Sequence, residues 1–372
     1  MHAGASRASP DEPVVTPIFQ TSTFFTAAVP EGEVRYTRYG TNPNHERLAE
    51  RLAAIEGAER ALPLASGNAA MALALLACIG AGDHIVALRS LYGGTLRLLN
   101  RELPRLGVET TFVDIEDDFS AAVQSTTRAL LIEMPVNPTL RIPDIEAIAR
   151  VARAAGVPLI VDATFATPIN FRPLEHGADL VVHSATKYLG GHSDVTAGVI
   201  AGRAELVAEA RERLVSFGPV LDPHATWLLE RGIKTLAVRM LRHNENGAAF
   251  AQHFASHAAV ERVIYPGLST HPDHERARRL FDGFGGMVSL VIGGGDDAAL
   301  RMMQRLRLAS AAPSLGGVET LVSMPRFTSH AALSAEQRRA IGIDDGFVRF
   351  SLGIEDAADL IADVEQALVA QS

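Results

Sequence analysis

Cysteine and long apolar runs are the two features that this sequence most clearly lacks. Cys78 is its one cysteine, which excludes a disulfide within the chain and favours a reducing compartment, where thiols persist. The longest apolar run, residues 69–80, is too short to cross a bilayer core of about 30 Å. Residues 1–15 contain no apolar core of the kind that a signal peptide needs. We therefore expect a cytoplasmic protein without a membrane partner.

Positive charge is scarce relative to negative charge. The sequence has 34 Lys and Arg residues against 43 Asp and Glu residues, which gives a formal net charge of −9. A polyanion such as nucleic acid is repelled by that balance, so we expect no nucleic-acid partner. At 372 residues, with 47% hydrophobic residues and neither repeats nor low-complexity tracts, the chain is long enough to fold as two globular domains.

Apolar runs of strand length recur along the first half of the chain, and helix-like stretches such as residues 145–155 separate most of them. This alternation predicts an α/β fold in which a mixed, mostly parallel sheet is covered by helices. In such sheets ligands bind at the carboxyl ends of the strands. The expected strands are residues 84–88, 109–114, 129–134, 158–163, 179–184 and 196–202.

Changes in composition predict the domain organisation. Prolines interrupt residues 1–42, which we interpret as an irregular N-terminal arm. Residues 43–240 contain the strand–helix alternation and predict a large α/β domain, whereas residues 241–372 predict a smaller α+β domain. Helical spacing extends over residues 44–57, 206–258 and 357–370, and further runs typical of the smaller domain cover residues 286–294, 306–317, 320–325 and 346–356.

Polar groups follow the apolar strands at the points where parallel strands end together. Asp162 ends one run, Ser184 and Lys187 follow the next, and Glu133 and Asn137 follow a third. Burial next to a strand lowers the pKa of a lysine and makes its neutral amine accessible. Each feature also has an ordinary alternative, because a strand-end aspartate caps helices and a lysine stem reaches solvent. Together, however, they favour a ligand site.

A phosphate seat precedes the first of these strands. The sequence Ser66-Gly67-Asn68 opens an apolar helix, whose first turn offers free N–H groups and the positive end of the helix dipole. A phosphate seat, a strand-end acid and a desolvated lysine together suit pyridoxal phosphate, because its aldehyde forms a Schiff base with a lysine and its ring nitrogen needs a carboxylate. We therefore predict pyridoxal phosphate as the cofactor, held by Lys187 and Asp162.

Motifs for other ligands are incomplete. The sequence has no phosphate-binding G-x-x-x-x-G-K-[ST] loop, and residues 283–288 (GFGGMV) break the dinucleotide fingerprint at their last position. Residues 191–195 (GHSDV) lack the closing glycine of a nucleophile elbow. We interpret residues 271–276 (HPDHER) as a charged loop without a third metal ligand, so we expect no metal site.

Several longer motifs extend the interpretation from chemistry to family. In chain order they are VVTPIFQTSTF, YTRYGTNPN, ASGNAAM, LYGGT, NPTLRIPDI, HSATKYLGGHSDVTAG, SLGGVETL and FVRFSLGIEDAADLIADVEQAL. With these motifs the sequence resembles, almost end to end, the Cys/Met-metabolism (transsulfuration) family of pyridoxal-phosphate-dependent enzymes. The resemblance implies the fold of type I pyridoxal-phosphate enzymes.

The resemblance also implies a role for each matching residue. Lys187 would bind the cofactor covalently and move the substrate α-proton, Asp162 would pair with the ring nitrogen, and Tyr92 would lie over the ring and move protons at the leaving sulfur. The substrate would be bound by Asn137, Ser314 and Arg349, with the guanidinium clamping its carboxylate. The other residues expected to bind the cofactor are Ser66, Gly67, Asn68, Thr164, Ser184 and Thr186.

Two further residues imply an assembly. In the family, the positions of Tyr36 and Arg38 bind the phosphate of a neighbouring subunit's cofactor. The arm, residues 1–42, would therefore contact a neighbouring subunit, and the resemblance implies active dimers within a homotetramer. From its residues alone, the sequence RYTRY favours a solvated aromatic and basic turn.

The implied function is carbon–sulfur lyase or transferase chemistry in cysteine and methionine biosynthesis. The enzyme would make or break the Cγ–S bond of cystathionine-like amino acids, by γ-elimination or γ-replacement through a vinylglycine-type intermediate, as a cystathionine γ-lyase or γ-synthase does. Methionine γ-lyase and O-acylhomoserine sulfhydrylase share the catalytic residues and stay open, as does the balance between β and γ cleavage. An aminotransferase of the same fold and a cofactor-holding regulator without turnover are the remaining alternatives.

Three positions bear on the substrate. Arg35 and Pro313 stand where relatives that handle cystathionine often carry glutamates, which would meet its distal amino group. Gly94 stands where methionine γ-lyase characteristically has cysteine. The first departure weakens the case for a cystathionine preference, and the second weakens the case for a methionine γ-lyase. Neither affects the shared chemistry.

Overall fold

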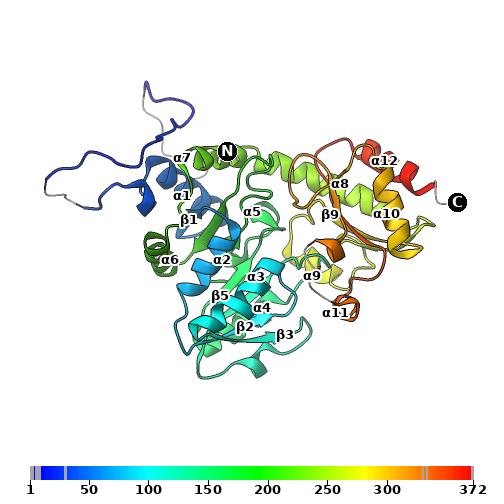
Figure 1. Cartoon of the computed structure of the whole chain (residues 1–372), viewed down its shortest axis with the longest axis horizontal. Helices are drawn as coiled ribbons and strands as arrows, with labels where there is room; N and C mark the ends of the chain where they lie inside the picture. The colour runs from blue at the N-terminus through cyan, green and yellow to red at the C-terminus, as the bar shows by residue number, and fades with distance from the viewer. Residues whose placement is uncertain (1–3, 5–9, 29–31, 329–330, 332–333, 370–372) are drawn as a thin grey trace.

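The computed structural model describes residues 4, 10–28, 32–328, 331 and 334–369. Within them the strands form two sheets, one of seven strands and one of five. In Figure 1 the larger sheet and its helices occupy the left and lower parts of the molecule. The smaller sheet lies at the right with α10 (Gly295–Arg305) and α12 (Ala357–Val369). The chain thus has two layered units that meet near the centre of the view.

The larger sheet has the strand order β1-β7-β6-β5-β4-β2-β3. Neighbouring strands from β6 to β3 in this order pair in parallel, whereas β7 is antiparallel to both β1 and β6. Every residue of β2, β6 and β7 is buried, as in sheets that helices cover on both faces. The mixed, mostly parallel sheet predicted from the sequence is confirmed. Its strands are β1 (Arg60–Leu64), β2 (His84–Leu88), β3 (Glu109–Val113), β4 (Thr127–Glu133), β5 (Leu159–Asp162), β6 (Leu180–His183) and β7 (Gly198–Gly202).

The smaller sheet has the order β10-β11-β12-β9-β8. Its central strands β9 and β12 are buried throughout, and they share an apolar core with α8 (Leu236–Phe254), α10 and α12. The boundary predicted between residues 240 and 241 falls inside α8, and the division into domains there stays a prediction. The strands are β8 (Val260–Ile264), β9 (Met287–Ile292), β10 (Ser310–Ala311), β11 (Leu321–Ser323) and β12 (Phe347–Ser351).

The other helices connect and cover the strands. None of the helices that the structure describes has both the length and the hydropathy of a membrane span. The remaining α-helices are α1 (Pro43–Glu56), α2 (Gly67–Leu76), α3 (Gly93–Arg97), α4 (Ile145–Ala155), α5 (Thr167–Asn170), α6 (Ala204–Phe217), α7 (Pro223–Ile233), α9 (His274–Leu280) and α11 (Ala335–Ala340).

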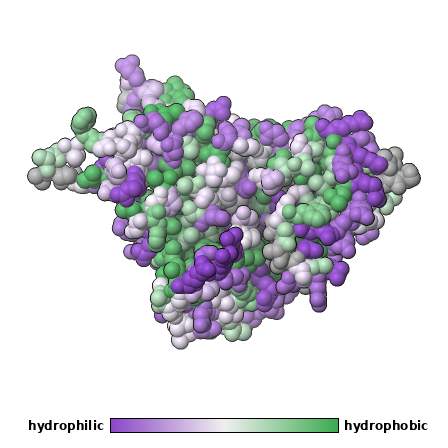
Figure 2. All heavy atoms as spheres, in the orientation of Figure 1, coloured by the Kyte–Doolittle hydropathy of each residue, from purple (hydrophilic) through white to green (hydrophobic). Residues whose placement is uncertain are grey.

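The N-terminal arm projects away from both sheets at the upper left of Figure 1. Apolar side chains on it are exposed, among them Val14 and Phe25, and Figure 2 shows hydrophobic residues on this projection. Residues 1–3, 5–9 and 29–31 of the arm lie outside the described residues.

Two strands lie where none was predicted, and both are at sheet edges. Strand β1 contains Pro63, which cannot donate a ladder hydrogen bond and is tolerated only at an edge or a bulge. Strand β8 carries the exposed charged residues Glu261 and Arg262 and therefore lacks the continuous apolar run of a central strand. Edge strands keep one side in solvent, so their sequences resemble those of loops.

The helical region expected over residues 206–258 is divided among three helices, α6, α7 and α8. Gly218, with φ 79°, ends α6 in the left-handed conformation, which glycine adopts without strain. The carboxylate of Asp222 then accepts hydrogen bonds from the amides of His224 and Ala225 and begins α7. The dipeptides Gly-Pro and Asp-Pro at these two points are the sequence signal that predicts the interruption. The last helix ends at Val369, and Ala370 lies outside the described residues.

Candidate active site

A cavity of about 550 Å³ lies at the carboxyl ends of β4, β5 and β6. Residues before β11 and on β12 of the smaller sheet also line it, so both sheets contribute walls. Every predicted site residue except Tyr36 and Arg38 lines this cavity. The predicted residues in its wall are Ser66, Gly67, Asn68, Tyr92, Asn137, Asp162, Thr164, Ser184, Thr186, Lys187, Ser314 and Arg349.

Lys187 lies in the turn that follows β6. The hydroxyl of Thr186 holds this turn against Ala197, the residue directly before β7, because it donates to the Ala197 carbonyl at 3.2 Å and accepts from the Ala197 amide at 3.0 Å. The Lys187 Nζ donates a hydrogen bond to the Ser314 hydroxyl at 2.8 Å. Burial, and then the nearby charge of Arg349, lower the pKa of Lys187 to about 8. The neutral amine, which can attack the carbonyl carbon of an aldehyde, is therefore accessible near neutral pH.

Asp162 ends β5 and faces the same cavity. Its Oδ1 accepts hydrogen bonds from the amide and the hydroxyl of Thr164, at 3.0 and 2.6 Å. With both of these donors on Oδ1, Oδ2 remains an acceptor for a cationic nitrogen. The Thr164 hydroxyl also accepts from the amide of Ser184 at 2.9 Å, so it fixes the ends of β5 and β6 relative to each other. Burial raises the pKa of Asp162 above its ordinary value. The hydrogen bonds from Thr164 and the charge of His183 lower this pKa and offset the effect of burial only in part.

A buried ion pair lies behind Asp162. His183 Nε2 is 2.6 Å from Glu56 Oε1, and both side chains are 1% exposed. Burial alone would lower the pKa of His183, but the Glu56 and Asp162 carboxylates raise it above its ordinary value. The resulting imidazolium favours the ionised form of Asp162. Neither His183 nor Glu56 was predicted as a site residue, although a histidine in the apolar run of residues 179–184 was a visible signal.

The phosphate seat is built from α2 and the turn after β6. The Ser66 hydroxyl caps α2 by accepting from the amide of Ala69 at 3.1 Å. A Cβ at Gly67 would lie 2.7 Å from the Cβ of Ser184, so only glycine lets these two segments approach so closely. The helix terminus, Ser184 and Thr186 thus line one cavity, and the free N–H groups of a helix terminus suit an anion.

Tyr92 is the most exposed of the predicted catalytic side chains, at 44%. Its amide donates to Glu133 Oε2 at 2.6 Å. A Cβ at Gly94 would lie 2.5 Å from Cε1 of the tyrosine ring, so the glycine lets the ring lie against the start of α3. Glu133 lines the cavity as well, and the sequence analysis noted its strand-end position without giving it a role.

Arg349, on β12, carries an unpaired donor into the site. Its side chain is 6% exposed, its Nη1 donates to the side-chain oxygen of Asn137 at 3.0 Å, and its Nη2 donates to the carbonyl of Ser314 at 3.1 Å. Its buried Nε has no partner among the described residues. Burial lowers the pKa of this guanidinium to about 10. A buried cation with a free donor favours binding of an anion, such as a carboxylate.

Tyr36 and Arg38 are not brought to this cavity within one chain. The Arg38 guanidinium donates to the carbonyl of Val215 at 3.0 Å and lies over the ring of Tyr39, 4.8 Å from its centroid. Both predicted residues lie on the N-terminal segment that leads into α1. Their predicted role toward a neighbouring subunit stays a prediction.

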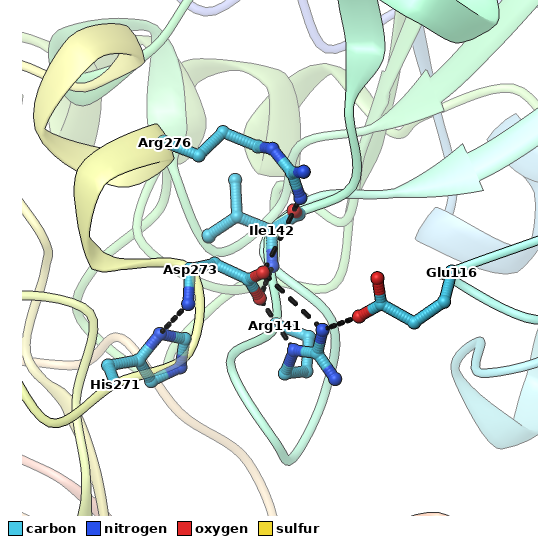
Figure 3. Close-up of polar contacts among 6 residues, drawn as sticks. All are labelled: Glu116, Arg141, Ile142, His271, Asp273 and Arg276. Carbon is cyan, nitrogen blue, oxygen red and sulfur yellow. Dashed lines mark hydrogen bonds and ion pairs between the residues drawn. The ribbon is translucent and has the colours of Figure 1, made fainter.

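The loop after β4 is joined to the segment that begins α9 by Asp273 (Figure 3). Its Oδ2 accepts from Arg141 Nε at 2.6 Å and from the amide of Ile142 at 2.9 Å, while Arg276 donates to the carbonyl of Ile142 at 2.6 Å. The histidine before it, His271, accepts from the Asp273 amide at 3.2 Å. We call these contacts the Asp273 joint. The loop expected at residues 271–276 is therefore wrong in part, because α9 begins at His274.

The groups in the cavity fit pyridoxal phosphate. A lysine with a lowered pKa suits its aldehyde, the acceptor on Asp162 suits a protonated ring nitrogen, and the close approach of Gly67 to Ser184 leaves helix N–H groups for its phosphate. No cluster of His, Cys, Asp and Glu side chains in the described part of the chain could hold a metal ion.

Comparisons with known proteins agree with this fit. The family described as Cys/Met metabolism PLP-dependent enzyme matches residues 1–369. A cystathionine gamma-lyase of Bacillus subtilis (strain 168) is 42% identical, and a cystathionine beta-lyase of Lactococcus lactis subsp. cremoris (strain MG1363) is 41% identical; each alignment covers 99% of this chain and 97% of the relative. The crystal structure of cystathionine gamma-lyase from Lactobacillus plantarum complexed with L-serine superposes with a TM-score of 0.93 at 36% identity, over 99% of this chain and 97% of that one.

The match over almost the whole length and the cavity point to the same conclusion. The chain belongs to the Cys/Met metabolism family of enzymes, which depend on pyridoxal phosphate.

Proposed function

We propose that this protein is a transsulfuration enzyme that makes or breaks the Cγ–S bond of cystathionine-like amino acids, of the cystathionine γ-lyase or γ-synthase type. One observation carries the proposal: Arg349, whose buried Nε has no partner among the described residues, lines the same cavity as Lys187 and Asp162. A carboxylate-binding cation beside a cofactor-binding lysine suits an α-amino acid substrate.

Each residue has a defined task in this proposal. Bound pyridoxal phosphate supplies a ring that accepts electrons from the substrate Cα. Asp162 accepts a hydrogen bond from its ring nitrogen, and Arg349 holds the substrate carboxylate bidentately. The amine of Lys187, with its pKa near 8, holds the cofactor and removes the proton from Cα. Tyr92 moves a proton at the leaving sulfur or oxygen.

The cavity wall also bears on the substrate. Among the described residues of one chain, its carboxyl groups are Glu133 and Asp162, and Pro313 lines the wall where related enzymes often carry glutamate. Arg35 instead pairs with Glu46 at 3.0 Å. No additional acid is therefore provided by this chain for the distal ammonium of cystathionine. This favours, as a second candidate, an O-acylhomoserine sulfhydrylase or a methionine γ-lyase, although Gly94 departs from the latter.

The proposed assembly is a homotetramer of active dimers in the cytoplasm. It is supported by the exposed apolar residues of the arm, such as Val14 and Phe25, and by the position of Arg38 outside its own cavity. A reducing compartment is supported by the presence of a single cysteine, Cys78. Burial raises the pKa of its thiol to about 12, so that this thiol is unreactive.

A product assay tests the function. The protein loaded with pyridoxal phosphate is supplied with cystathionine, methionine, homocysteine, and O-acylhomoserines with and without cysteine. Cleavage of Cγ–S in cystathionine releases 2-oxobutyrate, ammonia and cysteine, whereas cleavage of Cβ–S releases pyruvate, ammonia and homocysteine. A thioether formed from an O-acylhomoserine and cysteine identifies a synthase.

We expect γ-cleavage or thioether formation, and the matched variant Lys187→Ala should form neither product. Transfer of the amino group to an added 2-oxo acid as the main reaction would instead identify an aminotransferase. No turnover of any of these compounds by the loaded protein would contradict the proposal and favour a cofactor-holding regulator.

A further inference from the structure

Glu133, the last residue of β4, bridges two parts of the active-site wall. Its side chain is 5% exposed and lines the cavity. Its Oε2 accepts from the amide of Tyr92 at 2.6 Å, and its Oε1 accepts from the amide of Asn137 at 2.8 Å. Each carboxyl oxygen thus holds one backbone segment, and these segments belong to different strand ends.

A carboxyl group at this position is energetically unfavourable and therefore calls for an explanation. Burial, and then the neighbouring Asp162, raise the pKa of Glu133 to about 8, and the two amide hydrogen bonds only partly oppose this. Register places Glu133 directly opposite Asp162 on adjacent strands. A glutamine would avoid the charge, but only its oxygen accepts, because its NH2 group donates. Two N–H groups require two acceptors, which a carboxyl group provides.

Both amides belong to residues with proposed tasks. Tyr92 immediately precedes α3, and its ring is proposed to move a proton at the leaving group. Asn137 lies in the loop after β4, and its side-chain oxygen accepts from Arg349 Nη1 at 3.0 Å. Glu133 therefore connects the tyrosine to the residue that orients the carboxylate clamp. None of these contacts places Glu133 on the substrate itself.

We propose that Glu133 is a positioning residue whose two carboxyl oxygens fix Tyr92 and the Asn137–Arg349 pair relative to each other. The inference rests on the proposed function, because it gives Tyr92 a role at the leaving group and Arg349 a role at the carboxylate. Loss of the contact to the Tyr92 amide would displace Tyr92, and loss of the contact to the Asn137 amide would displace the Asn137–Arg349 pair. A displacement near 1 Å costs up to roughly 100-fold in rate.

The test compares Glu133→Gln with a matched control, Asp363→Asn. Asp363 is also a buried carboxylate that accepts from backbone amides, those of Arg307, Leu308 and Ala309 at 2.8 to 3.0 Å. It lies on α12 and is not part of the cavity wall. Each holoenzyme is measured for hydrogen exchange of the peptides that contain residues 92 and 137, for glycine affinity, and for kcat and KM.

We expect Glu133→Gln to retain the cofactor, to exchange faster at residues 92 and 137, to bind glycine more weakly, and to lose roughly 10- to 100-fold in kcat/KM with a raised KM. Asp363→Asn should lower the melting temperature but leave the exchange at both peptides, the glycine affinity and KM unchanged. If Glu133→Gln does not fold, Glu133→Asp, which withdraws the carboxyl by one methylene, is measured by the same criteria.

Two results would overturn the inference: unchanged exchange at both peptides, or faster exchange without any change in glycine affinity, kcat or KM, which identifies a purely structural carboxyl. Exchange and glycine affinity need no turnover. A protein that acts on none of the sulfur amino acids therefore contradicts the proposed function, while the bridging role of Glu133 is still judged by these two measurements.

Discussion

At the scale of single residues, the environment of Lys187 determines how the site can work. An ordinary lysine has a pKa near 10.4 and is almost entirely protonated at neutral pH. Burial and the charge of Arg349 lower the pKa of Lys187 to about 8, so roughly one amine in ten is neutral at pH 7. The same guanidinium that is proposed to hold the substrate carboxylate thus also activates the amine.

This coupling predicts the pH dependence of cofactor attachment. In cofactor-free protein, the rate of reaction of Lys187 with pyridoxal phosphate should rise with pH through a midpoint of about 8. Replacing Arg349 by glutamine removes a positive charge near the Lys187 amine. Because its removal stabilises the ammonium form, the midpoint should move to higher pH. Absorbance of the attached cofactor, followed in time at each pH, measures this rate.

The matched control is Arg262→Gln, because Arg262 lies outside the cavity and pairs with Asp344. Its midpoint should equal that of the unmodified protein. A midpoint that stays constant or falls in Arg349→Gln would show that the guanidinium does not act on the amine.

The sequence predicted these residues unequally. Lys187 and Asp162 were found because parallel strands end at one edge, so a polar residue after an apolar run marks the site. The pairing of His183 with Glu56 was not foreseen, because it joins residues 127 positions apart through packing that no local pattern records. The bridge of Glu133 was missed for the same reason, since its partners are backbone amides.

At the scale of elements, the Asp273 joint connects the loop after β4 to the start of α9. This loop carries Asn137 at one end and Arg141 at the other, and Figure 3 shows the carboxylate of Asp273 meeting both Arg141 and Ile142. Burial would raise the pKa of Asp273, but the hydrogen bonds from Arg141 and Ile142 lower it below its ordinary value. The joint is therefore a stabilising contact between elements that line or support the cavity.

Replacing Asp273 by asparagine should lower the free energy of unfolding by about 1.5–3 kcal/mol at neutral pH, because charged hydrogen bonds to Arg141 and Ile142 are lost. Since the native pKa of Asp273 is depressed, this contribution is fully present above the ordinary aspartate pKa of about 4 and is lost as the pH falls below it. Urea unfolding of both proteins at neutral and acid pH measures the difference.

The exposed residue Asp117 provides the matched control, and Asp117→Asn should change stability by less than about 0.5 kcal/mol. A stability loss in Asp273→Asn that persists unchanged at acid pH would contradict the electrostatic explanation.

Strands at the centre of the larger sheet were predictable, whereas the edge strands β1 and β8 were not. Buried strands such as β2 have continuous apolar runs, because helices cover both of their faces. Strands β1 and β8 lie at edges, where a proline or charged side chains are tolerated, so their sequences carry no comparable signal. The break between α6 and α7 had a local signal in its glycine and prolines, which the apolar spacing of the surrounding helices obscured.

At the scale of the whole molecule, the arm and the cavity favour an active site to which two subunits contribute residues. The fold of each unit could be predicted from periodicity and motifs, but the assembly depends on surfaces that a single sequence does not reveal. The exposed apolar residues of the arm and the absence of Tyr36 and Arg38 from their own cavity both agree with a site that a second copy completes.

Mixing two inactive variants tests this arrangement. If Arg38 serves the neighbouring site, dimers of Lys187→Ala with Arg38→Ala contain one intact site, and random mixing should restore about a quarter of the full activity. Turnover after denaturation and joint refolding measures the rescue, with mixed assembly verified by mass.

Mixing Lys187→Ala with Arg349→Ala is the control, because both residues line the cavity of one chain and every hybrid site keeps one defect. Equal rescue in both mixtures, or none in either despite verified mixing, would argue against a shared site.

The division of the cavity between two sheets has an evolutionary consequence. Asp162 ends β5 of the seven-stranded sheet and Lys187 lies in the turn after β6, whereas Arg349 and Ser314 belong to the segment that forms the five-stranded sheet. Substitutions in the last third of the chain can therefore alter which amino acid is accepted while Lys187 and Asp162 are retained, except at Arg349 and Ser314, which act on the Lys187 amine. A family with this division can change its substrate specificity and keep the residues that hold its cofactor.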